Sequence, residues 1–298
     1  MVVNHPESMK PNPDTQGSQG SQGSQGSQRG QSGQSGPQDG PGAMPPRRRG
    51  PPRAVPVARV EPLSPLMRRI VFTGDALEGF GPAKPGAHIK LIFGDLPEGG
   101  PGPGQPRPEM RTYTPRYFDA QRRELTVDFL LHGTGLASEW AASAQVGERL
   151  HIGGPGGGTD IDPALRAAVL LVDETAMPAA GMILDAVPAC CHVTLVCEVQ
   201  DAAEQRSISS RVPDRTLWLH RADANSAPGA LLLQTARDLP LDLPLQGGAQ
   251  WWVACESNAM RTIKAHLLQV RGLDRTQLIS RGYWQQGEVN HPDHDHGE

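Results

Sequence analysis

The hydrophobic pattern of this chain changes once, near residue 160, and that change limits how the chain can fold. Before it, from about residue 55, short strand-like runs are separated by turns rich in Gly and Pro, which is typical of antiparallel strands. After it, continuous apolar runs alternate with segments of helical spacing, which predicts buried parallel strands joined by helices. We therefore expect an N-terminal antiparallel β-barrel (residues 55–160) followed by a parallel-sheet α/β nucleotide-binding domain (residues 161–287).

The two ends of the chain have a different composition. Residues 1–54 include Gly-Ser-Gln repeats at 16–36 and hold none of the 13 aromatic residues, so they have too little apolar surface to offset chain entropy. We predict a disordered arm there. We expect Arg47, Arg48 and Arg49 to be solvated, with contact to an anionic partner as the alternative. Residues 288–298 form a His/Asp tail, in which we expect His291, His294 and His296 to be solvated, with weak metal binding as the alternative.

Composition excludes several classes of protein. A net charge of −4 argues against nucleic-acid binding, and no apolar run approaches the ~18–20 residues that would span a bilayer. The N-terminus lacks the apolar core of a signal peptide. Four Cys without paired spacing argue against a zinc ribbon, an iron–sulfur cluster or a disulfide scaffold. We expect a cytoplasmic monomer with no bound metal and no membrane insertion.

The best strand pattern lies at residues 124–132. Leu125, Val127 and Phe129 fall on one face, and the opposite face carries Asp128 and His132. We therefore expect these two polar side chains to lie on one side of the same strand.

The segment R-T-Y-T-P-R at 111–116 is the first candidate site. Arg111 offers a fork of donors suited to phosphate, Tyr113 a flat ring and Thr114 a hydroxyl. Ordinary decoration of an edge strand explains the same residues.

The segment H-G-T-G-L-A-S-E-W at 132–140 is the second candidate site. Its two glycines let the backbone approach a ligand. A helix beginning at Leu136 would offer free N–H groups to a phosphate.

Two further segments follow buried strands. V-D-E-T-A-M-P-A at 172–179 lies at the carboxyl end of the first parallel strand, where open α/β sheets bind ligands, although G-x-G-x-x-G is absent. A simple helix N-cap is the alternative there. W-W-V-A-C-E-S at 251–257 again enters a helix, which Ser257 is expected to cap. Cys255 fits a small apolar filler better than a reactive thiol, because no basic residue lies close by in sequence.

Together these motifs resemble one family. R-T-Y-T-P-R, D-F-L-L-H-G-T-G-L-A-S-E-W, D-E-T-A-M-P-A, the A-C-E turn and the closing R-G-Y-W are similar to segments of the siderophore-interacting protein family, within the ferredoxin-reductase-like flavoproteins. The resemblance covers about residues 55–287. It implies an FAD-containing, NAD(P)H-dependent ferric-siderophore reductase, with FAD held by the barrel.

The resemblance also implies roles for particular residues. The residues implied along the flavin and its pyrophosphate are Arg111, Tyr113, Thr114, Pro115 and Arg116, with Thr114 and Tyr113 as the catalytic candidates. Those implied at the ribityl or adenosine portion are Asp128 and His132, and those at the phosphates are Gly135, Ala137 and Ser138. Those implied at the nicotinamide are Asp173, Glu174 and Thr175 with Ala254, Cys255 and Glu256.

The chain departs from the family pattern at two places. The family usually has Gly where Cys255 stands, so a bulkier side chain is expected to crowd the nicotinamide. The family is usually basic after G-Y-W, where this chain has Gln285 and Gln286. Lys90 and Arg281 remain as basic candidates for the ferric siderophore, with Lys84 a weaker one, and for each an ordinary surface charge is the alternative.

The coenzyme is less well determined by the sequence. Glu198 at the end of the second parallel strand would favour the ribose of NADH, whereas Arg206 would receive the 2′-phosphate of NADPH. The resemblance favours NADPH.

The implied chemistry joins a two-electron donor to a one-electron acceptor. A nicotinamide gives hydride, Fe(III) accepts single electrons, and hard oxygen chelators hold Fe(III) more tightly than Fe(II). Two alternatives stay open: a general flavin or electron-transfer reductase with another acceptor, and a non-catalytic siderophore-binding module.

Overall fold

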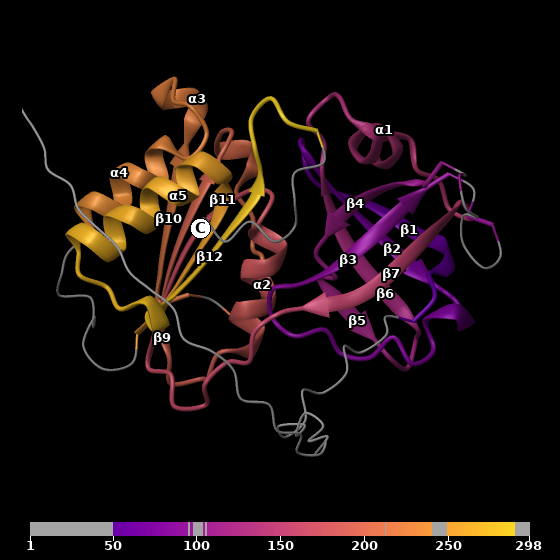
Figure 1. Ribbon diagram of the computed structural model, residues 1–298, viewed down its shortest axis with the longest axis horizontal. Helices are drawn as coiled ribbons and strands as arrows, with labels where there is room; N and C mark the ends of the chain where they lie inside the picture. Colours follow the sequence, from indigo (N-terminus) through magenta and orange to yellow (C-terminus); the bar gives the residue numbers. More distant parts are fainter. Residues whose placement is uncertain are drawn as a thin grey trace, which may run out of the picture. The chain divides into compact units, whose positions relative to one another are not determined.

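The computed structural model describes residues 50–94, 96–97, 104, 106–211, 213–239 and 249–289. Within these residues an antiparallel sheet is followed along the chain by a parallel α/β sheet, which confirms the predicted fold class (Figure 1). Most of the predicted arm, and the tail with His291, His294 and His296, lie outside the described residues. None of the described helices combines the length and the apolar character needed to cross a bilayer.

The first sheet has seven antiparallel strands in the order β4-β3-β7-β1-β2-β6-β5. The strands are β1 (Arg53–Ser64), β2 (Met67–Thr73), β3 (Ala87–Phe93), β4 (Glu109–Tyr113), β5 (Tyr117–Asp119), β6 (Glu124–Leu130) and β7 (Arg149–Gly157). Two short helices belong to this part of the chain, η1 (Asp75–Leu77) and α1 (Leu136–Ser143). The sheet encloses one core cluster, to which the predicted apolar face of β6 contributes three fully buried side chains, Leu125, Val127 and Phe129.

The start of β1 corrects one predicted boundary. The arm was expected to reach residue 54, but Arg53 and Ala54 already pair with Ile152 and His151 of β7. The ladder hydrogen bonds satisfy these backbone groups, so the strand extends two residues into the Gly/Pro-rich segment. At the other end, β7 stops at Gly157, close to the boundary that we place between residues 160 and 161.

The second sheet has five parallel strands in the order β10-β9-β8-β11-β12. The strands are β8 (Ala167–Asp173), β9 (His192–Val199), β10 (Arg215–His220), β11 (Ala249–Glu256) and β12 (Leu278–Trp284). The helices are α2 (Met177–Ala186), η2 (Ala202–Glu204), α3 (Arg221–Ala224), α4 (Ala230–Asp238), α5 (Ser257–Ala265), the π-helical η3 (His266–Val270) and η4 (Arg275–Gln277). The strand order reverses between β8 and β11, which places a topological switch point between their carboxyl ends.

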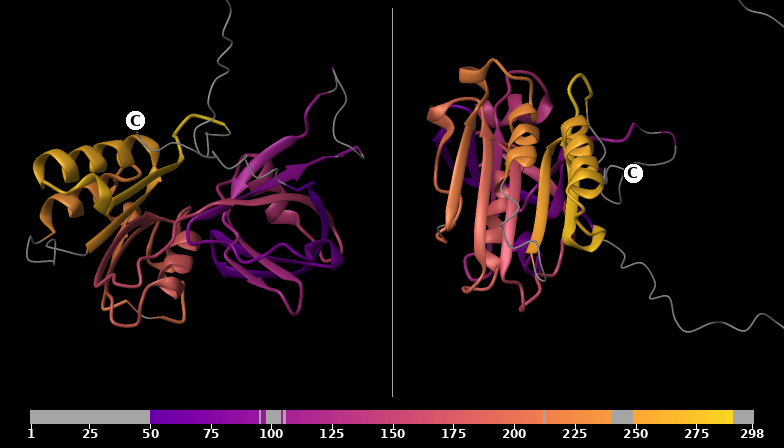
Figure 2. Two further views of the ribbon diagram at one scale, coloured as in Figure 1. Left: turned by 60° about the horizontal axis from the view of Figure 1, so that its bottom comes forward. Right: turned by 90° about the vertical axis from the view of Figure 1, so that its left-hand side faces the viewer.

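Separate core clusters cover the two faces of the parallel sheet. Helix α2 packs on one face with Leu170 and Trp252, and α4 and α5 pack on the other with Leu171 and Trp251 (Figures 1 and 2). Successive residues of β8 and β11 therefore point to opposite clusters, and both faces are apolar, as the continuous hydrophobic runs predicted.

The start and the end of α5 differ from expectation. Ser257 was expected to cap the helix, but the cap is Glu256, whose side chain accepts a hydrogen bond from the backbone N–H of Ala259. Met260, Ile263, Leu267 and Val270 form an apolar stripe at helical spacing, of which the first three side chains are buried and Val270 is 71% exposed. The chain becomes π-helical over His266–Val270, and the wider turn rotates the last residue of the stripe away from the core.

Candidate active site

The R-T-Y-T-P-R segment connects the two outermost strands of the antiparallel sheet. Arg111 and Tyr113 belong to β4, and the chain then passes through Thr114 to Arg116 into β5. The Arg111 guanidinium is mostly buried and donates to the Glu109 carboxylate at 2.8 Å and to the Met110 carbonyl at 3.0 Å. These two contacts fix the position of the Arg111 guanidinium at the edge of the sheet.

Tyr113 presents a flat, half-buried ring. Its centroid lies 4.5 Å from that of Phe129 in the core, so the core fixes the ring. Burial raises the pKa of the Tyr113 hydroxyl, which keeps it neutral, and the charge of Arg111 partly opposes the shift.

Thr114 lies where the R-T-Y-T segment meets the second sheet. The side chains of Thr114 and Pro115 are buried. Burial also raises the pKa of Tyr283 on β12, while the charge of Arg281 and a hydrogen bond to Thr114 lower it. This contact brings the end of β4 beside the carboxyl end of the parallel sheet.

The start of α1 forms a tight turn next to the end of β6. Gly135 precedes the helix with φ 106°, and a Cβ there would lie 3.2 Å from Cε1 of His132. The backbone N–H of His132 donates to the Ser138 hydroxyl at 3.0 Å, and the N–H of Gly135 donates to the Glu139 carboxylate at 3.1 Å. Ala137 is buried in the first turn. The helix begins at Leu136, as predicted, and these bonds hold its first turn against the strand.

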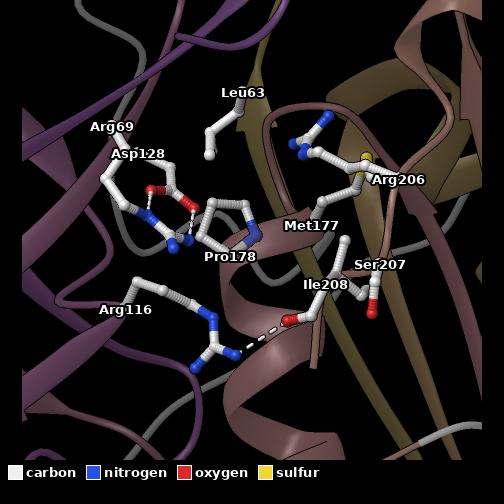
Figure 3. A pocket seen from close by; sticks show the side chains of 9 residues that line it. All are labelled: Leu63, Arg69, Arg116, Asp128, Met177, Pro178, Arg206, Ser207 and Ile208. Carbon is white, nitrogen blue, oxygen red and sulfur yellow. Dashed lines mark hydrogen bonds and ion pairs between the residues drawn. The ribbon is translucent and has the colours of Figure 1, made fainter. Parts of the chain in front are cut away.

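Arg116 and Asp128 lie around a pocket on the other side of the connecting segment (Figure 3). Arg116 donates to the Asp185 carboxylate and to the Ile208 carbonyl, each at 2.7 Å. Asp128 accepts two hydrogen bonds from Arg69, at 2.8 and 2.9 Å. Both predicted cofactor residues are thus engaged in ion pairs with other parts of the chain.

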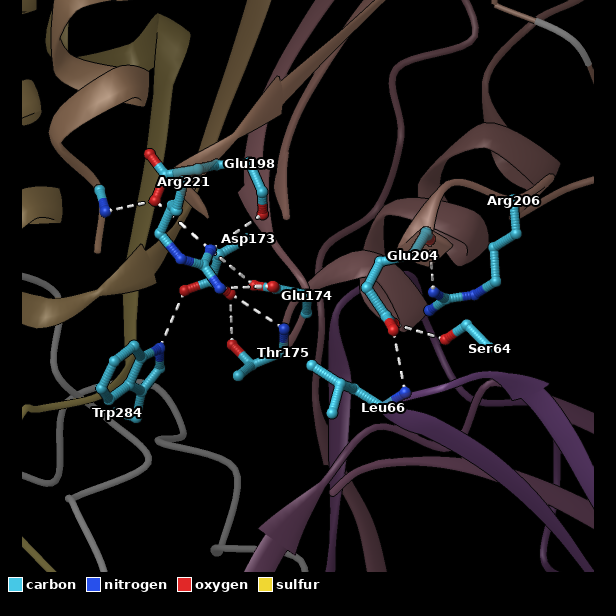
Figure 4. A network of polar contacts seen from close by, with 11 residues as sticks. Ser64, Leu66, Asp173, Glu174, Thr175, Glu198, Glu204, Arg206, Arg221 and Trp284 are labelled. Carbon is cyan, nitrogen blue, oxygen red and sulfur yellow. Dashed lines mark hydrogen bonds and ion pairs between the residues drawn. The ribbon is translucent and has the colours of Figure 1, made fainter. Parts of the chain in front are cut away.

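Asp173 ends β8 at the switch point and is almost completely buried (Figure 4). It accepts hydrogen bonds from the Thr175 N–H at 3.0 Å, the Thr175 hydroxyl at 2.5 Å and the Trp284 indole at 2.8 Å. Burial and the neighbouring charge of Glu174 raise the pKa of Asp173 to about 6, against the opposing effect of these hydrogen bonds. The carboxylate fixes the Trp284 ring at the carboxyl edge of the sheet.

Glu174 and Glu198 share one arginine. The Arg221 guanidinium donates to both Glu174 oxygens, at 2.9 and 2.5 Å, and approaches Glu198 at 3.5 Å. Glu198 has no exposed surface, and it also accepts from the backbone N–H groups of Gly229, Leu231 and Leu232 at the start of α4. Its carboxylate is saturated by the protein, so the ribose contact considered for it would require these bonds to break.

At the end of β11, the side chains of Cys255 and Glu256 both make contacts within the protein. The Cys255 thiol has no exposed surface and packs in the core with Met260 and Ile263; burial raises its pKa well above the ordinary thiol value. It faces the core, so the crowding expected of it is not observed. Glu256 caps α5 and accepts a weak hydrogen bond from the Gln286 N–H at 3.3 Å. Ala254 is half-buried on the opposite face of β11.

The basic substrate candidates are distributed over two sheets. Lys90 on β3 donates to the Thr112 hydroxyl at 2.6 Å, and Arg281 lines an apolar pocket together with Ala254 and Tyr283. Lys84 is exposed and forms a surface ion pair with Asp160.

Sequence reasoning missed three residues of this edge. Arg221 and Trp284 hold the buried carboxylates, and the Arg261 guanidinium lies 3.5 Å from the Gln285 side chain. Arg261 on α5 therefore places a positive charge beside Gln285, a position at which the family usually has a basic residue. Arg221 directly follows the strand that ends at His220, and this placement could have identified it in the sequence as a residue of the carboxyl edge.

Three features of the antiparallel sheet and α1 have the chemistry that a flavin nucleotide requires. Strand β4 carries the fixed Arg111 guanidinium and the flat Tyr113 ring, which packs on the core. Helix α1 begins directly after Gly135. A Cβ at Gly135 would meet His132, so the tight turn needs glycine. Phosphate groups bind at this kind of helix start, and an arginine supplies the countercharge.

An antiparallel sheet followed by a five-stranded parallel α/β sheet defines the ferredoxin-reductase-like fold. The ferredoxin reductase of carbazole 1,9a-dioxygenase shares it, with a TM-score of 0.59 at 16% identity over 76% of this chain and 68% of that one. At this identity the likeness concerns the fold alone.

The family follows from sequence comparison. The siderophore-interacting FAD-binding domain family matches residues 56–159, and the siderophore-interacting protein family matches residues 165–287. The ferric vibriobactin reductase of Vibrio cholerae is 30% identical over 254 residues, covering 80% of this chain and 90% of that protein. The chain belongs to the siderophore-interacting protein family.

Two further relatives support this assignment. The crystal structure of a siderophore utilization protein from T. fusca matches with a TM-score of 0.69 and 32% identity, over 82% of this chain and 96% of that one. The NADPH-dependent ferric-chelate reductase of Escherichia coli is 39% identical over 137 residues, which cover 43% of this chain and 54% of that protein.

Proposed function

We propose that this protein is an FAD-containing, NAD(P)H-dependent ferric-siderophore reductase. The observation that carries the proposal is the meeting of two sites: Thr114, at the end of the R-T-Y-T segment, contacts Tyr283 at the carboxyl edge of the parallel sheet. A ligand on the first site would therefore lie next to a ligand at the switch point between β8 and β11.

The chain's own residues bind and orient the cofactor. Arg111 would pair with the pyrophosphate, Tyr113 would supply a flat wall fixed by the core, and the first turn of α1 would direct N–H groups at the phosphates. The Thr114 hydroxyl, next to Tyr283, would offer a hydrogen bond to the flavin. When bound, FAD supplies the step between a two-electron hydride donor and a one-electron ferric acceptor. No protein nucleophile is needed for this chemistry.

The acceptor is proposed to be a ferric siderophore, and Lys90 and Arg281 its basic contacts. Relatives at about 30% identity carry the names of ferric-siderophore reductases, which favours this acceptor over an electron-transfer protein. Chelators with hard oxygen donors bind Fe(III) more tightly than Fe(II), so reduction weakens the complex. Arg261 beside Gln285 supplies further positive charge for an anionic chelate.

The test uses the full chain, reconstituted with FAD under anaerobic conditions. NADPH and NADH are compared as donors, and ferric complexes of catecholate and hydroxamate chelators are offered with a trap for Fe(II). We expect coenzyme-dependent formation of trapped Fe(II), faster with NADPH, since the Escherichia coli relative is named as NADPH-dependent. Coenzyme oxidation that ferric chelates do not accelerate would favour another acceptor. A chain that fails to take up FAD would refute the proposal.

A further inference from the structure

Arg116, the last residue of the R-T-Y-T-P-R segment, joins the antiparallel sheet to the α/β part of the chain. Its guanidinium donates to the Asp185 carboxylate of α2 and to the Ile208 carbonyl in the segment before β10, each at 2.7 Å (Figure 3). The Arg116 side chain is only 11% exposed. One mostly buried side chain of the first sheet is therefore bound to two separate segments of the second.

Gly181 gives α2 the surface that receives this guanidinium. A Cβ at this position would lie 2.6 Å from Nε and 2.9 Å from Cζ of Arg116, and 2.5 Å from the Ile208 oxygen. All three separations are below 3.0 Å, which is closer than Cβ atoms approach other atoms in proteins. Glycine therefore allows the guanidinium and the Ile208 carbonyl to lie directly against the helix.

Both partners of Arg116 are held in place by other bonds. The second oxygen of the Asp185 carboxylate accepts from the Ser209 hydroxyl at 2.5 Å. The Arg211 guanidinium donates to the Pro188 carbonyl at 2.9 Å, which ties the segment that contains Ser209 to the chain just after α2. Arg116 is thus attached to groups whose positions do not depend on it.

The segment that Arg116 anchors carries Thr114. The side chains of Thr114 and Pro115 are buried, and β5 begins directly after Arg116. Thr114 is hydrogen-bonded to Tyr283 at the carboxyl edge of the parallel sheet. The proline ring fixes the backbone between the two residues, so a displacement of Arg116 would displace Thr114 as well.

We propose that Arg116 is a positioning residue, which fixes Thr114 at the junction of the two sheets through its contacts with α2 and the segment before β10. The resemblance implied that Arg116 lines the flavin, whereas both terminal nitrogens of its guanidinium bind the protein. Only the place of the flavin beside Thr114 rests on the proposed function. A small displacement of reacting groups costs a large factor in rate, so loss of the anchor should slow reduction of FAD without weakening its binding.

The test uses the full chain reconstituted with FAD and variants that break the pair between Arg116 and Asp185. Asp185→Asn removes the charge but keeps an oxygen for Ser209. Arg116→Gln removes the guanidinium, and Arg116→Lys keeps the charge but loses the fork. Arg59→Gln is the matched control, because Arg59 forms a two-point ion pair with Glu124 inside the antiparallel sheet.

Stopped-flow absorbance measures the rate at which saturating NADPH reduces bound FAD, and a fluorescence titration measures the dissociation constant of FAD. We expect Asp185→Asn and Arg116→Gln each to slow the reduction about tenfold or more, with the FAD dissociation constant within about threefold of the wild-type value. The double variant should be no slower than the slower single variant, because both changes remove the same contact. Arg116→Lys should recover part of the rate, and Arg59→Gln should match the wild type.

Wild-type reduction rates in both single variants would overturn the proposal. Weaker FAD binding in Arg116→Gln, together with normal binding and a normal rate in Asp185→Asn, would also overturn it and make Arg116 a cofactor contact. A wild-type chain that takes up no FAD, or whose FAD the coenzyme does not reduce, would contradict the proposed function instead. Hydrogen exchange over residues 113–117 of the cofactor-free protein then decides: faster exchange in both variants supports the anchor, and unchanged exchange overturns it.

Discussion

The buried carboxyl group of Asp173 makes the stability of the fold depend on pH. Burial raises its pKa from an ordinary 3.8 to about 6, and the charges of Glu174 and Glu198 add to the shift. Three hydrogen bonds from Thr175 and Trp284 stabilise the carboxylate without cancelling the effect. The perturbation to test is therefore the loss of this proton as the pH rises.

The sign of the effect follows from proton binding. Between pH 3.8 and about pH 6 the folded chain holds a proton on Asp173 that the unfolded chain has released, so the free energy of unfolding falls as the pH rises through this range. A pKa difference of about 2 corresponds to about 3 kcal/mol in total, of which about 1.4 kcal/mol is lost between pH 5 and pH 7.5. The side chain is fully buried, so solvent screening does not reduce this figure greatly.

The assay is urea denaturation at several pH values between 5 and 7.5. The wild type and Asp173→Asn are compared by the slope of their unfolding free energy against pH. Asparagine cannot titrate, so the variant should lack about 1.4 kcal/mol of the wild-type pH dependence, although it also loses one hydrogen bond at every pH. Asp160→Asn, at an exposed position, should leave the slope unchanged. Parallel pH profiles of wild type and Asp173→Asn would refute the reasoning.

Three further predictions use the same approach. Arg111→Ala should weaken FAD binding by about 1.5–3 kcal/mol, measured by quenching of flavin fluorescence. The control variant Arg122→Ala, at an exposed site, should bind FAD as the wild type does. An Arg111→Ala variant with the FAD affinity of the wild type would contradict the flavin site. Glu204→Ala leaves two donors of the β1–β2 turn without an acceptor and should lower the free energy of unfolding by about 2–4 kcal/mol; a loss below about 0.5 kcal/mol would exclude this role. In the native protein a thiol reagent should modify exposed Cys190 quickly and buried Cys255 only on unfolding, and equal rates would disprove the burial.

Patterns that depend on local periodicity could be predicted from the sequence. The alternation at Leu125, Val127 and Phe129 reflects a sheet with one buried face, and all three side chains are fully buried. The continuous run at 167–172 gave a strand covered on both faces, and it became β8. In both cases the pattern is a direct consequence of which face meets the core.

Features that depend on distant partners could not be predicted. Serine is a preferred N-cap residue and glutamate is not, so the sequence pointed to Ser257, and only the structure shows that Glu256 reaches the Ala259 N–H. Helix α4 lies outside the helical segments found in the sequence, because its first turn is held by Glu198, more than thirty residues earlier. The segment that became β12 was noted for its R-G-Y-W motif alone, and its pairing with β11 supplies the strand.

The carboxyl edge of the parallel sheet, the edge at which open α/β sheets bind ligands, carries several acids, and each of them has partners within the protein. Arg221 serves Glu174 and Glu198, backbone N–H groups serve Glu198 and Glu256, and Asp173 is shifted toward its neutral form. Acids that are satisfied in this way repel a phosphate far less than free carboxylates would.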